Sequence, residues 1–339
     1  MSKKKLYGNA YVRSYRWSAA AQRPELLRGS RSEKGKEILM IGRFRVRTDL
    51  AMENGEKFEK DQVEIPGVEI KKRYNRGRDL WTTLVKIETE QGARLMEKPV
   101  GTYVTMEAPN LAVPDDEYHR EISEEIARCL KKMLPKDQDC SVLVVGLGNR
   151  DITADALGPM VVDNLQITRH IVNEYGVAAM GEEHVIRVSA LVPGVMAQTG
   201  METQEIVQGV IAETKPDVLV VIDALAARSI RRLNCTIQLT DTGISPGSGV
   251  GNYRTGLNRE TMKIPVIGIG VPTVVDAATI LHDAVAELLE SLEESEMDEF
   301  LSELISPSLT SMYVTPKDID ETVKRLSFTI SEGLNMAFS

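Results

Sequence analysis

The chain is poor in cysteine and histidine, and this scarcity excludes several kinds of site. Its three cysteines show no C-x-x-C spacing, which argues against a disulfide framework or a cysteine zinc site and is typical of a reducing compartment. None of its four histidines belongs to an H-E-x-x-H or similar metal-binding motif. No serine has an evident histidine partner, so serine catalysis is not expected. Any catalysis has to depend on other groups.

Long apolar runs are also absent. No run approaches the ~18 residues that a transmembrane helix requires. The start, Met1-Ser-Lys-Lys-Lys-Leu6, lacks the apolar core of a secretory signal. We therefore expect a cytoplasmic protein that has no membrane partner.

The net charge of −9 hides an uneven distribution of charge. Residues 1–49 contain 13 Lys and Arg against 4 Asp and Glu, whereas the remainder contains 28 against 46. A basic arm of this kind is either a solvated tail or a segment that docks on the acidic body or binds nucleic acid. Because an acidic body repels phosphates, we expect the folded part to bind no nucleic acid directly.

The pattern of apolar residues predicts the fold class. Short β-like runs lie within residues 58–110, and an amphipathic helix is predicted over 114–133. From residue 141 onward, strands and helices alternate. The predicted strands are 142–145, 185–191, 218–222, 235–239 and 265–270, and the predicted helices are 155–175, 203–214, 275–292 and 317–337. This order predicts an α/β fold, with a mostly parallel sheet covered by helices on both faces and a smaller antiparallel β portion near the N-terminus. We expect residues 50–339 to form a single domain.

Two of the predicted strands each lead to an aspartate. Asp155 follows the strand at 142–145, and Asp223 ends the strand at 218–222. The carboxyl ends of parallel strands meet at one edge of a sheet, where ligands bind, so we expect the two carboxylates to lie close together. Such a pair shares a proton and activates a water molecule. The alternative is that each aspartate caps a helix or forms a salt bridge.

A glycine-rich segment lies between two predicted strands. Five of the twelve residues in 241–252 are Gly or Pro. Such a loop lets the backbone approach a ligand closely and supplies amide donors. We expect the amides of Gly247, Ser248, Gly249 and Gly251 to contact substrate and to stabilise an oxyanion. The alternative is a long flexible connection.

The turn Gly146-Leu-Gly-Asn149 after a strand has two possible interpretations. A nucleotide-binding module is the weaker one, because the third glycine of G-x-G-x-x-G is replaced by Asp151, which would repel a pyrophosphate. The turn and Asp155 resemble the motif of hydrogenase maturation proteases, whose fold is phosphorylase/hydrolase-like and whose second carboxylate falls on Asp223. Those proteases add a histidine to bind a metal, and residues 243–252 contain none. We therefore expect neither metal nor cofactor, with a metal-dependent maturation-type protease as the alternative.

Longer strings resemble the germination protease family of spore-forming bacteria. They are 46–53, the Asp155 motif, 220–228, 241–252 and 269–276, and the resemblance covers residues 44–339. It implies an endopeptidase that is made as a zymogen and cleaves small acid-soluble spore proteins during germination. It also implies that Asp155 and Asp223 are the catalytic pair, that the enzyme lies in the spore core and that it forms a homotetramer. The alternative from another class is a non-catalytic scaffold that binds the same proteins.

The resemblance also implies a processing site. Asp49-Leu50-Ala-Met-Glu53 fits the cut-site pattern of the family, which reads acidic, bulky apolar, small, any residue, Glu, with the cut after the first acidic residue. We expect autoprocessing between Asp49 and Leu50 to remove residues 1–49 as a basic propeptide. The alternative is that this segment is only the start of a strand.

Overall fold

The computed structural model describes residues 48–60, 64–136, 140–181, 185–247, 255–288, 309 and 312–339. Almost all of the basic arm lies outside the described residues, so its separation from a protease domain that starts at residue 50 remains a prediction. None of the described helices is both long and apolar enough to cross a membrane.

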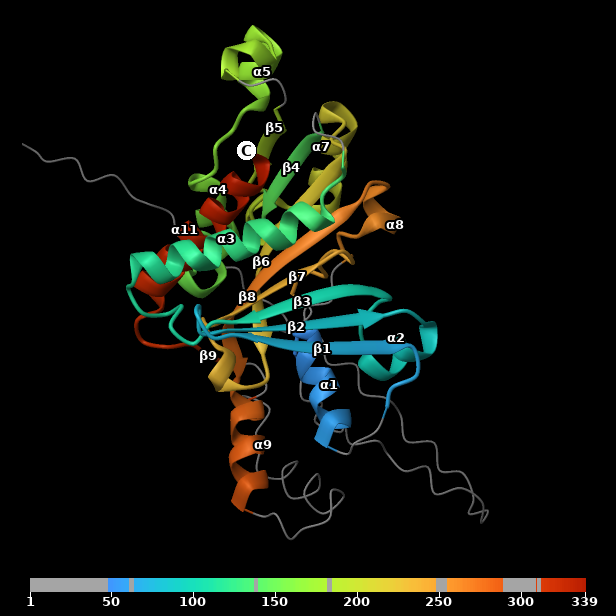
Figure 1. The fold of residues 1–339 in the computed structure, drawn as a ribbon, viewed down its shortest axis with the longest axis vertical. Helices are drawn as coiled ribbons and strands as arrows, with labels where there is room; N and C mark the ends of the chain where they lie inside the picture. The colour runs from blue at the N-terminus through green and yellow to red at the C-terminus, as the bar shows by residue number, and fades with distance from the viewer. Residues whose placement is uncertain are drawn as a thin grey trace, which may run out of the picture. The chain divides into compact units, whose positions relative to one another are not determined.

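Within the described residues, nine strands form one sheet (Figure 1). Its order is β1-β2-β3-β7-β8-β6-β4-β5, with the short β9 beside β8. The strands are β1 Val68–Asn75, β2 Leu80–Ile87, β3 Gly101–Glu107, β4 Ser141–Gly146, β5 Arg187–Leu191, β6 Val218–Ala227, β7 Thr236–Thr240, β8 Val266–Asp276 and β9 Tyr313–Val314. Strands β5, β4, β6 and β8 pair in parallel, and β1, β2, β3 and β7 pair antiparallel. The predicted α/β class is confirmed, and β7 joins the antiparallel portion to the parallel one.

Helices cover both faces of the parallel strands. The helices are α1 Ala51–Lys60, α2 Glu90–Met96, α3 Asp116–Met133, α4 Leu157–Asp163, α5 Arg169–Tyr175, α6 Met196–Thr199, α7 Thr203–Thr214, α8 Arg259–Met262, α9 Ala277–Leu288 and α11 Ile319–Phe338, with 3-10 turns η1 Thr153–Asp155, η2 Val177–Met180 and η3 Ile230–Arg232. Successive residues of a strand point to opposite faces. Val142 and Val144 of β4 pack in the core that contains α3, α4 and α11, while Leu143 and Val145 pack with Val207 of α7 on the other face.

The single helix predicted over residues 155–175 is wrong. The chain forms η1, α4 and α5 there instead, because local polar groups end α4 and hold the next segment beside β5. Asn164 is the C-cap of α4, and its side-chain amide donates to the carbonyl of Met160. Thr168 then bonds to β5 through its backbone amide and its hydroxyl, with Val188 and Ile186 as partners. These side-chain bonds override the helical pattern of the sequence.

The position of Asp223 in its strand also differs from the prediction. β6 does not end before Asp223 but continues to Ala227, supported on one side by β8. On its other side, β4 pairs with β6 only as far as Ile222. Residues 223–227 therefore extend past the end of β4, and we call this segment the β6 overhang. Asp223 is its first residue.

Candidate active site

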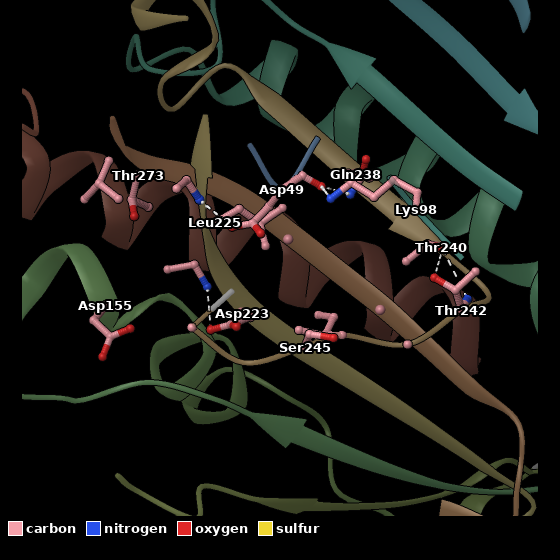
Figure 2. A pocket seen from close by; sticks show the side chains of 18 of the residues that line it. Asp49, Lys98, Asp155, Asp223, Leu225, Gln238, Thr240, Thr242, Ser245 and Thr273 are labelled. Atoms are coloured by element: carbon pink, nitrogen blue, oxygen red, sulfur yellow. Dashed lines mark hydrogen bonds between the residues drawn. The ribbon is translucent and has the colours of Figure 1, made fainter. Parts of the chain in front are cut away.

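A cavity of about 600 Å³ opens beside the β6 overhang, and it contains the carboxylates that the sequence singles out. Asp155 and Asp223 both line it, and Asp49 lines it as well (Figure 2). The remaining walls come largely from β7, β8 and the start of the glycine-rich segment. The structure thus brings together the predicted aspartate pair and the first residue of the predicted processing site. Their catalytic role remains a prediction at this point.

Asp155 is positioned by the glycine turn that follows β4. It is the last residue of η1, and its carboxylate accepts a hydrogen bond of 2.8 Å from the amide of Asn149. The close approach of Asp155 to this turn requires a glycine at 148. Gly148 has φ +117°, and a β-carbon there would lie 1.8 Å from the carbonyl oxygen of Asp155. The predicted alternative that Asp155 caps the next helix is wrong, because Ala156 is the N-cap of α4. The amide donor favours the ionised form of this carboxylate.

Asp223 has a different environment, because it is almost completely buried. Its side chain is 7% exposed and accepts a hydrogen bond of 3.0 Å from the amide of Ala224. Burial raises the pKa of Asp223 well above its usual value, and the negative charges of Asp155 and Asp49 raise it further, against the effect of the Ala224 amide. Asp223 therefore keeps its proton at a pH at which an exposed aspartate is ionised. One carboxylate that accepts an amide and one that holds a proton are suited to acid–base chemistry.

Asp49 bonds to the β6 overhang through both its backbone and its side chain. Its amide donates to the carbonyl of Ala226 at 3.0 Å, and its carboxylate accepts from the amide of Ala226 at 2.9 Å. Its carbonyl oxygen accepts from Lys98 Nζ and from Gln238 Nε2, each at 3.1 Å. The next residue, Leu50, is fully buried against Leu225 and other side chains of a small apolar cluster. The Asp49–Leu50 bond is therefore fixed at the wall of the cavity that the two aspartates line.

Glu53 anchors the other end of the predicted processing motif. Its side chain is buried, and its two oxygens have separate donors. Oε1 accepts from the amide of Ser229 at 3.1 Å and from Arg232 at 2.9 Å, whereas Oε2 accepts from the amide of Arg228 at 2.9 Å and from the hydroxyl of Thr48. Helix α1 thus begins from a segment that is fixed at both ends of the motif.

Only the start of the predicted oxyanion loop lies within the described residues. Gly247 lines the cavity, as do Gly243 and Ser245, while Ser248, Gly249 and Gly251 lie outside the described residues. The base of the segment is closed by two backbone hydrogen bonds between Ile244 and Leu257. The role expected for this loop remains a prediction.

Within the described ranges, no group of three or more His, Cys, Asp or Glu side chains is arranged to hold a metal ion. Asp155 and Asp223 suit proton transfer, but two carboxylates are also common metal ligands. Chelation therefore belongs among the tests of function.

Sequence reasoning missed two residues that contact the Asp49 carbonyl. Lys98 follows the left-handed C-cap of α2, Glu97, and its amide bonds to the carbonyl of Ala93. Nothing in a turn reading Glu-Lys-Pro distinguishes this lysine from a solvated one. Gln238 gave a usable signal, because it is an amide inside the apolar strand β7 and is 6% exposed. Buried polar side chains normally have a specific partner.

The chain is similar to known proteins over most of its length. The family profile described as germination protease matches residues 46–292. A germination protease of Caldanaerobacter subterraneus subsp. tengcongensis is 43% identical over 317 residues, which cover 88% of this chain and 95% of the relative. Those of Clostridium tetani and Bacillus velezensis are 43% and 38% identical, over 86% and 88% of this chain and 95% of each relative. The chain therefore belongs to the germination protease family, whose name describes a peptidase of spore germination.

Proposed function

We propose that this chain is an aspartic-type endopeptidase, made as a zymogen, that cuts itself between Asp49 and Leu50 and then cleaves small acid-soluble spore proteins. One observation carries the proposal: the Asp49–Leu50 bond is fixed at the same cavity that Asp155 and Asp223 line. The germination protease relatives support peptidase activity. The identity of the substrates, the homotetramer and the location in the spore core follow from the sequence resemblance.

The environments of the two aspartates support an assignment of their proposed roles. Asp155, ionised beside the Asn149 amide, takes a proton from a water molecule as the water oxygen bonds to the peptide carbonyl carbon. Asp223, whose pKa burial raises, holds a proton that it gives to the carbonyl oxygen or to the leaving amine as the C–N bond breaks. Asp155 then holds one proton and Asp223 none, and transfer between them restores the starting state. The pair titrates as a unit, as two close carboxylates do.

The decisive test uses two forms of the protein. Purified full-length chain is incubated and its N-terminus is followed by intact mass. A chain that starts at Leu50, released from a removable fusion, is given a peptide that contains Glu-Ile-Ala-Ser-Glu. We expect loss of residues 1–49 in the first case and a single cut after the first Glu in the second.

Matched variants identify the chemistry. Asp155→Asn and Asp223→Asn are each expected to abolish both cuts, whereas Asp163→Asn is expected to retain them, because Asp163 is an exposed partner of Arg150. Full activity in either variant of the pair would end the dyad model. Loss of activity with a chelator and recovery with added metal would favour the metal-dependent alternative. A folded wild-type chain that binds the peptide without cutting it would favour the scaffold.

A further inference from the structure

Two side chains from different elements clamp the Asp49–Leu50 bond. Lys98 Nζ, beyond the end of α2, and Gln238 Nε2, from β7, both donate to the carbonyl oxygen of Asp49 at 3.1 Å. Gln238 also reaches across the bond, since its Oε1 accepts from the amide of Ala51 at 2.8 Å. Figure 2 shows Lys98 and Gln238 close together beside Asp49 on the cavity wall. One carbonyl oxygen therefore has a cationic donor and an amide donor.

This arrangement matches what peptide hydrolysis needs at that atom. When water adds to the carbonyl carbon, negative charge develops on the carbonyl oxygen, and fixed donors near it stabilise the transition state. A cation that is already in place in a partly buried site has a larger effect than it would have in water. The glycine-rich loop was the predicted source of such donors, whereas Lys98 and Gln238 come from the segment after α2 and from β7.

We propose that Lys98 and Gln238 form the oxyanion-binding site of this peptidase, first for the Asp49–Leu50 bond and afterwards for the cut bond of a substrate. The inference rests on the proposed function and extends it. With the carbonyl oxygen held by these two donors, the proton of Asp223 goes to the leaving amine.

The two sides of the bond are held by different contacts, and this explains how the site is used again. The hydrogen-bond acceptors of Lys98, the carbonyls of Thr48 and Asp49, both leave with residues 1–49. Ala51 and Glu53 stay bound to Gln238 and to the Arg232 region. Processing thus empties the places of Thr48 and Asp49 and leaves the other side filled. A substrate enters by placing the residues that precede its cut bond there.

The vacated place also selects the residue before the cut. The amide of Ala226, which holds the carboxylate of Asp49, becomes available to another carboxylate. Lys98 adds positive charge at the same place. This place therefore fits the acidic residue that precedes the cut in the family's cut-site pattern.

The charge of Lys98 depends on pH. Burial lowers the pKa of Lys98 below its usual value, and the carboxylates of Asp49, Glu53 and Glu97 oppose this shift. Asp155 and Asp223 line the same cavity. Because the pKa is lowered, the ammonium loses its proton at a lower pH than that of an exposed lysine. Turnover is then expected to fall on the alkaline side as this charge is lost.

The test measures self-processing in the full-length chain and kcat and KM in the chain that starts at Leu50. Lys98→Met removes the charge and keeps the length of the side chain, and Gln238→Leu removes the second donor. Lys86→Met is the matched control, since Lys86 is exposed on β2 and pairs with Glu88. We expect each site variant to slow self-processing and to lower kcat roughly 100-fold or more, with a much smaller change in KM. Lys98→Met should also lose the alkaline limb of the kcat profile.

The outcomes separate this inference from the proposed function. A wild-type chain that cuts neither itself nor the peptide contradicts the proposed function. A wild-type chain that cuts, beside Lys98→Met and Gln238→Leu variants that cut at the same rate, overturns only the oxyanion site. Circular dichroism and melting temperature check the fold of each variant. If Lys98→Met fails to fold, the kcat of Gln238→Leu decides.

Discussion

Replacing Glu53 by Gln tests how firmly the processing motif is anchored. The change keeps the shape of the side chain but turns one acceptor oxygen into an NH2 donor. In the structure both oxygens are acceptors with two donors each, from Ser229 and Arg232 at one and from Arg228 and Thr48 at the other. Neither orientation of a glutamine amide can accept from all four.

The better orientation places the NH2 group beside Thr48, whose hydroxyl can rotate and become an acceptor. The amide of Arg228 then loses the Glu53 oxygen in a partly buried position, which costs about 1–3 kcal/mol. The bond to Arg232 also loses its charge, although Arg232 keeps Glu56 and Glu107 as partners. Together these effects correspond to about 2–4 kcal/mol, or roughly 3–6 °C in Tm for a chain of this size.

Melting temperature and the rate of self-processing are measured for Glu53→Gln beside Glu56→Gln. Glu56 bonds the same arginine but is 37% exposed, so its loss should cost less than about 1 kcal/mol. We expect a lower Tm and slower cutting only in Glu53→Gln, because the Asp49–Leu50 bond is then held less firmly. A Glu53→Gln chain that melts within 1 °C of Glu56→Gln and cuts itself at the wild-type rate would refute this account of the anchor.

Two further predictions concern the aspartate pair. The pKa of Asp223 is raised on folding, so its contribution to stability is present below the ordinary aspartate value and is lost as pH rises through the raised pKa. Because Asp223→Asn stays neutral, it should raise Tm at pH 8 but not at pH 4. The gain in stability at pH 8 should be about 1.4 kcal/mol for each unit by which folding raises the pKa of Asp223. An equal effect at both pH values would contradict this prediction. Gly148→Ala should displace Asp155 and lower peptide cleavage roughly 100-fold, whereas Gly209→Ala in α7, with open space around it, should leave cleavage unchanged.

The fold could be predicted where apolar pattern and burial agree. Strands β4 and β6 are apolar at almost every position because both of their faces are covered, and this was readable from the sequence. The break between α4 and α5 was not readable. It depends on Thr168, whose partners are Val188 in the later strand β5 and Ile186 just before that strand. A local pattern carries no information about a bond made so far along the chain.

The candidate site, like the fold, could be predicted only in part from the sequence. Asp155 and Asp223 could be predicted because strand ends gather ligands in α/β sheets. The places of Lys98 and Gln238 could not be derived, since they depend on the pairing of β3 with β7. Strand β7 in turn joins the antiparallel portion of the sheet to the parallel one. The pairing of β3 with β7 brings the end of α2 to the cavity, and it connects residues about 130 positions apart, such as Tyr103 and Thr240.

The β6 overhang explains why the buried carboxyl of Asp223 lies beside the strand edge that is proposed to bind substrate. The pairing of β4 with β6 stops at Ile222. The backbone of Gly158 passes close to Gly146, where a β-carbon on residue 146 would lie 2.3 Å from the carbonyl oxygen of Gly158. From Asp223 onward, β6 therefore has a side that β4 does not cover. The first residue of this overhang supplies the buried carboxyl, and Ala226 supplies an amide and a carbonyl for an added strand. A peptide that pairs there extends past Asp223 in a fixed register, so its binding also positions the bond that is to be cut. Asp49 bonds to Ala226 in this overhang, and under the proposed function its departure opens the edge to substrate.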